Sequence, residues 1–227
     1  MRGFLVSGTV MIQQGELFLA TPPDTLSFEK SAWNNGYFYV AGIDEAGRGP
    51  LAGPVMAAAV ILPVGLTIIG VDDSKKLSPD KREKLFDIIM EQAFSIGVGS
   101  MAPADIDRIN ILQATRRAML AAVQNLTQLP DYLLIDGISS IDSTIPQKTI
   151  KKGDSLSLSI AAASIIAKVT RDRIMVEMDA KYPGYGFAGH KGYGSAAHLD
   201  AIRRLGPSPI HRLTFGGVKE HINCTCS

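Results

Sequence analysis

Four carboxylates in this chain stand where the sequence pattern predicts that a strand ends or a helix begins. Asp44 and Glu45 follow one apolar run. Asp136 closes another, and Asp154 precedes a long helical pattern. Two strands of one sheet can bring their terminal carboxylates together, where repulsion raises their pKa values unless cations neutralise them. Ligands that are all oxygen suit Mg²⁺ or Mn²⁺, and two such ions roughly 3.5–4 Å apart can assist phosphodiester hydrolysis.

Each carboxylate also has an ordinary structural explanation. An Asp-Glu pair alone is most often an exposed turn, Asp136 before Gly137 could be a turn residue, and an Asp before a helix is a common N-cap. Adjacent side chains of a regular strand point to opposite faces. Asp44 and Glu45 can therefore serve one site only if the strand ends or bulges there. A metal site is indicated only by the four carboxylates taken together, because each alone has an ordinary structural explanation.

The segment Gly47-Arg48-Gly49-Pro50 follows the acidic pair directly. Its glycines allow a sharp bend and let backbone N–H groups come close to a ligand. A structural turn would accept almost any polar residue where Arg48 stands. An arginine amid glycines beside carboxylates therefore favours a site that holds a metal next to a phosphate.

Composition bounds the class of protein. The 227 residues and 46% apolar content fit one globular domain with a substantial core. Cys224 and Cys226 suggest no disulfide framework, so we expect a reducing, cytoplasmic compartment. With His221 they could bind zinc, but three potential ligands in a tail are a weak indication. No apolar run approaches the length of a membrane span, so we expect no membrane association.

The charge is unevenly distributed along the chain. Residues 1–110 carry 9 Lys/Arg against 13 Asp/Glu, and residues 111–227 carry 14 against 9, for a total of +1. Most basic residues of the second part fall in doublets, such as Arg116-Arg117 and Arg203-Arg204, or in the near-doublet of Arg171 with Arg173. Such doublets are usually solvated helix faces, so they permit a polyanionic partner without requiring one.

The hydrophobic pattern predicts an α/β domain with a mixed sheet. Predicted strands cover residues 37–43, 54–62, 93–101, 131–137 and 149–151. Predicted helices are a short one with Leu26 and Trp33 on one face, one capped by Ser78 with Leu85, Ile88 and Ile89 inward, and stretches at 103–126, 156–180 and 195–205. In the stretch at 103–126 the candidate core positions are Ile109, Leu112, Leu120 and Val123. Residues 1–20 show no period.

Six segments in this order resemble ribonuclease HII. They are Gly42-Ile43-Asp44-Glu45-Ala46-Gly47-Arg48-Gly49-Pro50, Asp73-Ser74-Lys75-Lys76-Leu77, Leu134-Ile135-Asp136-Gly137, Lys152-Gly153-Asp154-Ser155, the run 161–169 and Lys191-Gly192-Tyr193-Gly194. The resemblance spans about residues 28–221. It implies a ribonuclease H-like fold, with a mixed five-stranded sheet flanked by helices and a C-terminal helical region. Residues 1–27 would then be an extension of unknown role, residues 28–221 the catalytic domain, and residues 222–227 a tail.

The resemblance also implies an activity: endonucleolytic cleavage of RNA in RNA–DNA hybrids and of single ribonucleotides embedded in duplex DNA, by a monomer using two Mg²⁺ or Mn²⁺ ions. Carried over position by position, the metal ligands are Asp44, Glu45, Asp136 and Asp154. The implied substrate contacts are Gly47, Arg48 and Gly49 at the ribonucleotide's 2′-hydroxyl, Tyr193 beside the RNA–DNA junction, and Lys75 and Lys168.

Two departures and two competing interpretations accompany this resemblance. Residues 1–20 match no family element. Gly216-Gly217 stands where, in the family, a proline often follows the His-Arg-x-x-Phe segment, which is residues 211–215 here. The related ribonuclease HIII lacks the Gly-Arg-Gly element. A catalytically silent nucleic-acid-binding module on the same fold would be expected to lack a metal carboxylate, yet all four are present. A phosphatase acting on small phosphoesters would have no need of Tyr193.

Overall fold

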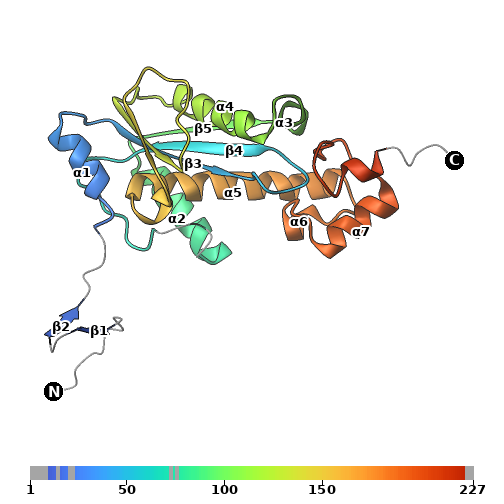
Figure 1. Cartoon of the computed structure of the whole chain (residues 1–227), viewed down its shortest axis with the longest axis horizontal. Coiled ribbons are helices and arrows are strands. Elements are labelled where there is room, and N and C mark those ends of the chain that lie inside the picture. Colours follow the sequence, from blue (N-terminus) through green and yellow to red (C-terminus); the bar gives the residue numbers. More distant parts are fainter. Residues whose placement is uncertain (1–9, 14–15, 20–23, 72–73, 75–76, 223–227) are drawn as a thin grey trace.

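A mixed five-stranded sheet forms the centre of the molecule. The computed structural model describes residues 10–13, 16–19, 24–71, 74 and 77–222. The strand order is β5-β4-β3-β6-β7. Strands β3, β4 and β5 are labelled at the centre of the molecule in Figure 1. The strands are β3 Val40–Ala46, β4 Val55–Ile61, β5 Ser95–Met101, β6 Tyr132–Asp136 and β7 Gln147–Ile150. β3, β4 and β5 pair antiparallel, whereas β6 and β7 continue the sheet in parallel from β3. The predicted mixed sheet is confirmed.

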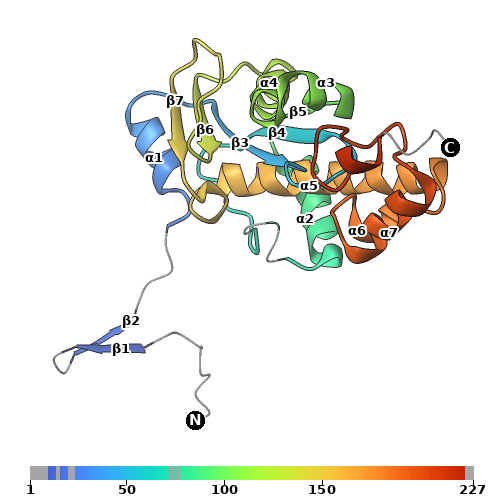
Figure 2. The ribbon, with the colours of Figure 1, turned by 45° about the vertical axis from the view of Figure 1, so that its right-hand side comes forward.

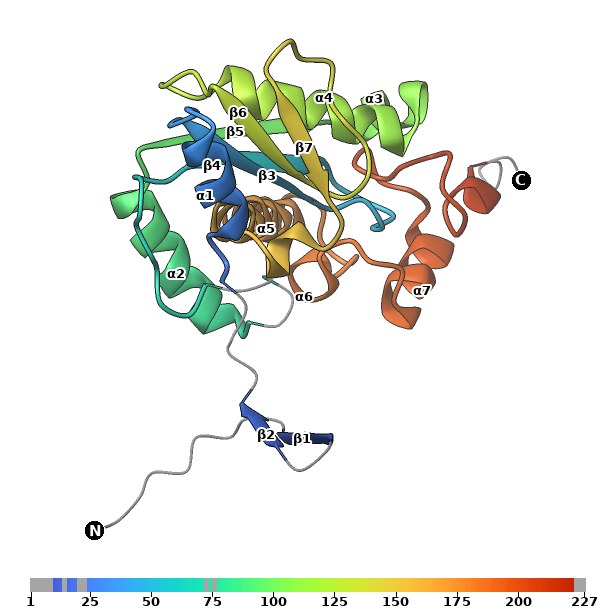
Figure 3. The ribbon, with the colours of Figure 1, turned by 60° about the vertical axis from the view of Figure 1, so that its left-hand side comes forward.

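Helices cover both faces of the sheet and make three layers. The helices are α1 Ser27–Asn34, α2 Pro79–Gln92, α3 Pro103–Ile109, α4 Ile111–Gln124, α5 Leu158–Lys181, α6 Phe187–His190 and α7 Ala196–Leu205. Figure 3 looks almost along α5, which lies with α2 below the sheet while α3 and α4 lie above it. α6 and α7 gather at the C-terminal end of α5 (Figure 2). None of the described helices has the length and apolar character needed to span a membrane.

Glycines let the helices lie directly on the strands. A Cβ built on Gly42 of β3 would lie 2.1 Å from the carbonyl carbon of Ser159 in α5. On the opposite face, a Cβ on Gly99 of β5 would lie 2.2 Å from the carbonyl oxygen of Ala118 in α4. Both contacts are with helix backbone, which cannot rotate aside as a side chain can. The absence of a side chain at Gly42 therefore lets the first turn of α5 pack in direct backbone contact with β3.

The predicted helix at 103–126 is wrong in one respect, because the chain breaks it at Asn110. This residue adopts a φ of 66° and ends α3. Its side chain then accepts the N–H of Gln113 (3.1 Å) and caps α4, as asparagine commonly does. The new start turns Leu112 outward, where it is 42% exposed, so its prediction as a core residue is wrong. Val123 is buried as predicted, and Ile109 and Leu120 pack against the core from its edge.

The other predicted elements agree with the structure more closely. Ser78 accepts the N–H of Lys81 at the start of α2, and Leu85 and Ile89 are buried while Ile88 is partly buried. Leu26 is the N-cap of the predicted short helix α1. The N-terminal part contains an antiparallel pair that the sequence pattern did not indicate, β1 Val10–Gln13 with β2 Glu16–Leu19. Cys224 and Cys226 lie outside the described residues.

We predict that Gly42→Ala destabilises the protein, because its methyl group would overlap the backbone of α5. Overpacking of this kind typically costs about 1–3 kcal/mol, and the cost here should be at the upper end. Thermal or denaturant unfolding measures it. Gly216→Ala is the control, since a Cβ there meets no atom within 4 Å. Equal unfolding midpoints for the two variants would show that α5 can move away from β3 without penalty.

Candidate active site

The sheet opens between β3 and β6 at the position of the first acidic residues. β3 pairs in parallel with β6 only as far as Ile43 opposite Ile135, so Asp44 and Asp136 directly follow the last pair. On its other side β3 stays paired with β4 up to Ala46. The prediction that the strand ends at 43 is therefore wrong on the β4 side and right on the β6 side. The resulting fork holds Asp44 and Asp136 on neighbouring strands.

Asp44 lies deepest in this fork, with 3% of its surface exposed. Its Oδ1 accepts the backbone N–H of Glu45 (2.7 Å). Burial, followed by the negative charges of Glu45 and Asp136, raises the pKa of Asp44 well above its usual value, while hydrogen bonds from the Glu45 N–H and Ser164 act in the opposite direction. The carboxylates of Glu45 and Asp136 are thus both close enough to repel that of Asp44. A bound cation would relieve this repulsion.

Asp136 and Asp154 are brought together by the turn that precedes α5. The N–H of Gly153 donates to Asp136 Oδ1 (2.6 Å). Asp154 is buried in the same turn, η1 Gly153–Ser155. The alternative explanation of Asp154 as the N-cap of α5 is wrong, because Ser157 caps that helix by accepting the N–H of Ile160. The burial of Asp154 therefore requires an explanation other than capping.

The carboxylate oxygens are the type of ligand that a hard cation prefers, although their arrangement does not form a complete coordination site among the described residues. Among the described residues, no three His, Cys, Asp or Glu side chains stand arranged to hold a metal ion. Glu45 Oε1 accepts a hydrogen bond from Arg48 Nη1 (3.3 Å), and Asp136 Oδ1 is taken by Gly153. A donor set made only of carboxylate oxygens, with repulsion at the buried Asp44 that a cation would relieve, nevertheless fits Mg²⁺ or Mn²⁺.

A cleft of about 260 Å³ lies beside Glu45. Its lining residues are Glu45, Ala46, Gly47, Arg48, Gly49, Ser74, Lys168 and Tyr193. The structure thus brings five of the predicted substrate contacts into one cleft with one of the predicted metal ligands. Lys75 lies outside the described residues. Asp44, Asp136 and Asp154 do not line this cleft.

The basic and aromatic side chains of the cleft differ in their contacts: Lys168 is held by an ion pair, whereas Tyr193 is exposed. Lys168 Nζ lies 2.7 Å from Asp172 Oδ1 on the same helix. Burial lowers the pKa of Lys168, and its bond to Asp172 partly compensates. Tyr193 is 48% exposed. An exposed ring beside a glycine-rich backbone offers a flat surface to a ligand.

Two residues that support the cleft were not found by sequence reasoning. Arg171 and Arg212 are fully buried beneath Gly47, and a Cβ on Gly47 would lie 2.0 Å from Arg171 Nε. The only signal was a charged residue on the apolar face of the predicted long helix, where Arg171 lies four residues before Met175. Arg212 carried no such signal, since it lies outside any predicted element.

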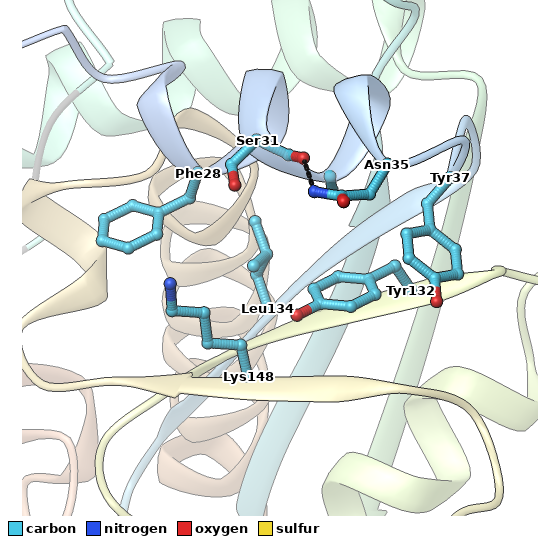
Figure 4. A pocket seen from close by; sticks show the side chains of 8 residues that line it. Phe28, Ser31, Asn35, Tyr37, Tyr132, Leu134 and Lys148 are labelled. Atoms are coloured by element: carbon cyan, nitrogen blue, oxygen red, sulfur yellow. Dashed lines mark hydrogen bonds between the residues drawn. The ribbon is translucent and has the colours of Figure 1, made fainter.

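A second hollow lies between α1 and strands β6 and β7 (Figure 4). Aromatic rings line it, and Lys148 lies with its Nζ 4.8 Å from the ring centre of Phe28. The lining residues are Phe28, Ser31, Ala32, Asn35, Tyr37, Tyr132, Leu134 and Lys148. None of the four carboxylates is among them, so this hollow lies outside the candidate site.

Comparisons with known proteins agree in sequence and in fold. The sequence model described as Ribonuclease HII matches residues 41–218. The ribonuclease HII of Pelobacter propionicus is 66% identical over 216 residues, which cover 95% of this chain and 99% of that protein. The structure of ribonuclease H2 from Pyrococcus horikoshii OT3 has a TM-score of 0.67 at 29% identity, covering 80% of this chain and 95% of the other. The structure of the PCNA:RNase HII complex from Archaeoglobus fulgidus gives 0.66 at 25% identity, covering 78% and 95%.

These matches span the sheet, the fork and the C-terminal helices. The ribonuclease H-like fold expected from the sequence motifs is confirmed. With a family match over 178 residues, from 41 to 218, and near-complete coverage of a 66% identical relative, the chain belongs to the ribonuclease HII family, whose members are type 2 ribonuclease H endonucleases.

Proposed function

We propose that the chain cuts the RNA strand of RNA–DNA hybrids and cuts duplex DNA on the 5′ side of a single embedded ribonucleotide. The observation that carries this proposal is the adjacency of two unlike parts. One is the carboxylate cluster at the fork between β3 and β6. The other is the cleft in which the Gly-Arg-Gly backbone and the Tyr193 ring meet. A nuclease that recognises a ribose needs both.

The carboxylates of the fork are the proposed metal ligands. Asp44, Glu45, Asp136 and Asp154 would hold two divalent ions, Mg²⁺ or Mn²⁺. When bound, such ions lower the pKa of a water molecule and neutralise charge on the scissile phosphate. The protein's own part is to keep the Asp44 side chain buried beside Ser164 of α5 and to hold Asp136 by the Gly153 N–H. Lys168, which lines the neighbouring cleft together with Glu45, would attract a phosphate.

The cleft is the proposed reader of the ribose. Arg48 and Gly49 are exposed, and within the described parts of the chain their backbone N–H groups meet no acceptor. An N–H donor can bond a 2′-hydroxyl, which distinguishes RNA from DNA at the sugar. Tyr193 would lie flat against the deoxyribose that follows, where a second 2′-hydroxyl would crowd the ring.

Asp136→Asn tests the metal ligands. Asparagine keeps the oxygen that accepts the Gly153 N–H, so we expect a folded protein. Loss of one anionic ligand should lower cleavage by about a hundredfold or more, since metal stabilisation of transition-state charge is worth several kcal/mol. Cleavage of a DNA duplex carrying one ribonucleotide, with and without chelator, measures it. Asp142→Asn, at an exposed carboxylate, is the control. If the activity of Asp136→Asn is within a few-fold of wild type, Asp136 is not a metal ligand and only stabilises the turn at Gly153 by its hydrogen bond.

The product ends test the nucleophile. If water attacks the phosphate 5′ of the ribonucleotide, the DNA fragment ends in a 3′-hydroxyl and the ribonucleotide carries a 5′-phosphate. The 2′-hydroxyl is then a recognition group. Mass spectrometry of the two fragments distinguishes the routes. A 2′,3′-cyclic phosphate would contradict the proposal, because only attack by the 2′-oxygen forms it.

Tyr193→Ala tests the reading of the junction. Aromatic stacking on a base is worth about 1–3 kcal/mol, and contact with a sugar should reach the low end. We expect a loss of about fivefold in kcat/KM on the single-ribonucleotide duplex, and a smaller loss on a continuous RNA–DNA hybrid. Tyr193→Phe retains the ring and should keep the preference. If Tyr193→Ala lowers cleavage of both substrates equally, the ring supports its loop and does not read the junction.

A further inference from the structure

Two buried arginines lie beneath the loop formed by residues 47–54. Arg171 on α5 is 1% exposed, and Arg212 is 0% exposed. Within the described residues neither guanidinium forms an ion pair with a carboxylate. Instead, every hydrogen bond that they donate there goes to a backbone carbonyl. Burying a charge is costly unless it is well hydrogen-bonded, so this arrangement stabilises one particular backbone path.

Arg212 holds the Gly-Arg-Gly segment by its carbonyls. Its Nη2 donates to the carbonyl oxygen of Gly47 (2.6 Å), and its Nη1 donates to that of Arg48 (2.9 Å). Its Nε and Nη2 both donate to the carbonyl of Gly53 (3.1 and 2.9 Å). The planar guanidinium therefore bridges the start and the end of the loop with four hydrogen bonds.

The direction of these carbonyls determines the direction of the neighbouring N–H groups. In a planar trans peptide the C=O of one residue and the N–H of the next point in opposite directions, and no cis peptide occurs among the described residues. Since the carbonyls of Gly47 and Arg48 point inward to Arg212, the N–H groups of Arg48 and Gly49 point outward. Both of these residues line the cleft.

Arg171 joins this loop to the loop that carries Tyr193. Its Nε donates to the carbonyl of Pro54 (3.0 Å) and its Nη2 to that of Ala52 (3.1 Å). Its Nη1 reaches the carbonyl of Lys191 (3.0 Å), two residues before Tyr193. One buried side chain thus bonds both loops that contribute residues to the cleft.

The two loops are also in direct contact. The N–H of Leu51 donates to the carbonyl of Gly192 (2.8 Å). A Cβ on Gly192 would lie 2.5 Å from the carbonyl oxygen of Ala52. A ring carbon of Tyr193 lies 3.7 Å from the position of a Cβ on Gly49. The two arginines, the loop and the tyrosine therefore form one tightly packed unit.

We propose that Arg171 and Arg212 are positioning residues for ribose recognition, which hold the N–H groups of Arg48 and Gly49 and the ring of Tyr193 in a fixed arrangement around the substrate. This inference rests on the proposed function, because it takes those groups as the readers of the ribose. The arginines touch no substrate themselves. They act through the backbone that they hold.

Arg212→Lys tests this role directly. Lysine keeps the charge, but its single ammonium cannot replace the fork that bonds carbonyls 47, 48 and 53 together. We expect kcat/KM on the single-ribonucleotide duplex to fall between about tenfold and about a hundredfold, the effect of misplacing a binding group by about 1 Å. The dissociation constant for an all-DNA duplex of the same length should change by less than about twofold. Thermal melting sets the assay temperature below the unfolding transition of each variant.

Arg173→Lys is the control, at an exposed arginine on the same helix as Arg171, and should leave both quantities unchanged. The positioning role is overturned if Arg212→Lys leaves cleavage unchanged, or if cleavage and all-DNA binding fall together, as they would in a generally loosened protein.

Arg171→Lys gives a second test through Tyr193. If Arg171 acts partly by placing the ring, the double variant Arg171→Lys/Tyr193→Ala should lose less than the product of the two single losses, by at least about threefold, as contacts that act together do. Losses that multiply would contradict the link between the two loops. This cycle also covers the case in which Arg212→Lys does not fold.

Hydrogen exchange separates failure of this inference from failure of the proposed function. Amide exchange of residues 47–54 in the free protein, followed by mass spectrometry, should be faster in both arginine variants than in wild type and Arg173→Lys. Unchanged exchange overturns the positioning role even in an active enzyme. If wild type cuts no ribonucleotide-containing duplex, the proposed function fails, whatever the exchange result.

Discussion

The close packing of α5 on β3 is the constraint on which the rest of the site depends. The two elements run side by side, so that successive residues of β3 and of the loop after it contact successive turns of α5. Gly42 faces Ser159, Asp44 faces Ser164, and Gly47 faces Arg171. The five residue steps from Gly42 to Gly47 span roughly 16 Å in extended chain, and the twelve steps from Ser159 to Arg171 span roughly 18 Å in a helix. The two segments therefore cover nearly the same distance. Because Gly42 has no side chain, the helix lies close enough for each later contact to form.

One helix therefore positions groups that lie far apart in the sequence. Its start follows the turn that carries Asp154 and that bonds Asp136 through Gly153. Its middle places Ser164 beside Asp44 and Lys168 in the cleft. About two turns after Ser164, its Arg171 supports the loop after β3. Movement of α5 would disturb the carboxylates and the reading loop at the same time, so cutting and reading share a single support.

Much of this arrangement could be predicted from the sequence, because it depends on local patterns. A capping Ser78 before Pro79, apolar runs ended by Asp136 and a helix rich in small residues all have direct sequence signals. The errors arose where tertiary contacts decided the outcome. β3 continues past Asp44 because β4 still pairs with it. Ser157, and not Asp154, caps α5 because the chain inserts a 3₁₀ turn before that helix. The role of Arg212 could not be predicted, because the carbonyls it bonds are present in every residue and leave no mark on the sequence.

The use of buried arginines, and not of carboxylate-paired ones, has a physical reason in a site for a polyanion. A carboxylate beside Arg171 or Arg212 would cancel its charge and add a negative group to a site where burial and the charges of Glu45 and Asp136 already raise the pKa of Asp44. Carbonyl oxygens satisfy the guanidinium hydrogens without adding a net charge. Burial, together with the charge of Arg171, lowers the pKa of Arg212 to about 9, so Arg212 remains protonated at neutral pH. The loop is thus held from behind by two positive charges while its N–H dipoles point outward. Both effects favour an approaching phosphate backbone, and the glycines of the loop allow that backbone to come close.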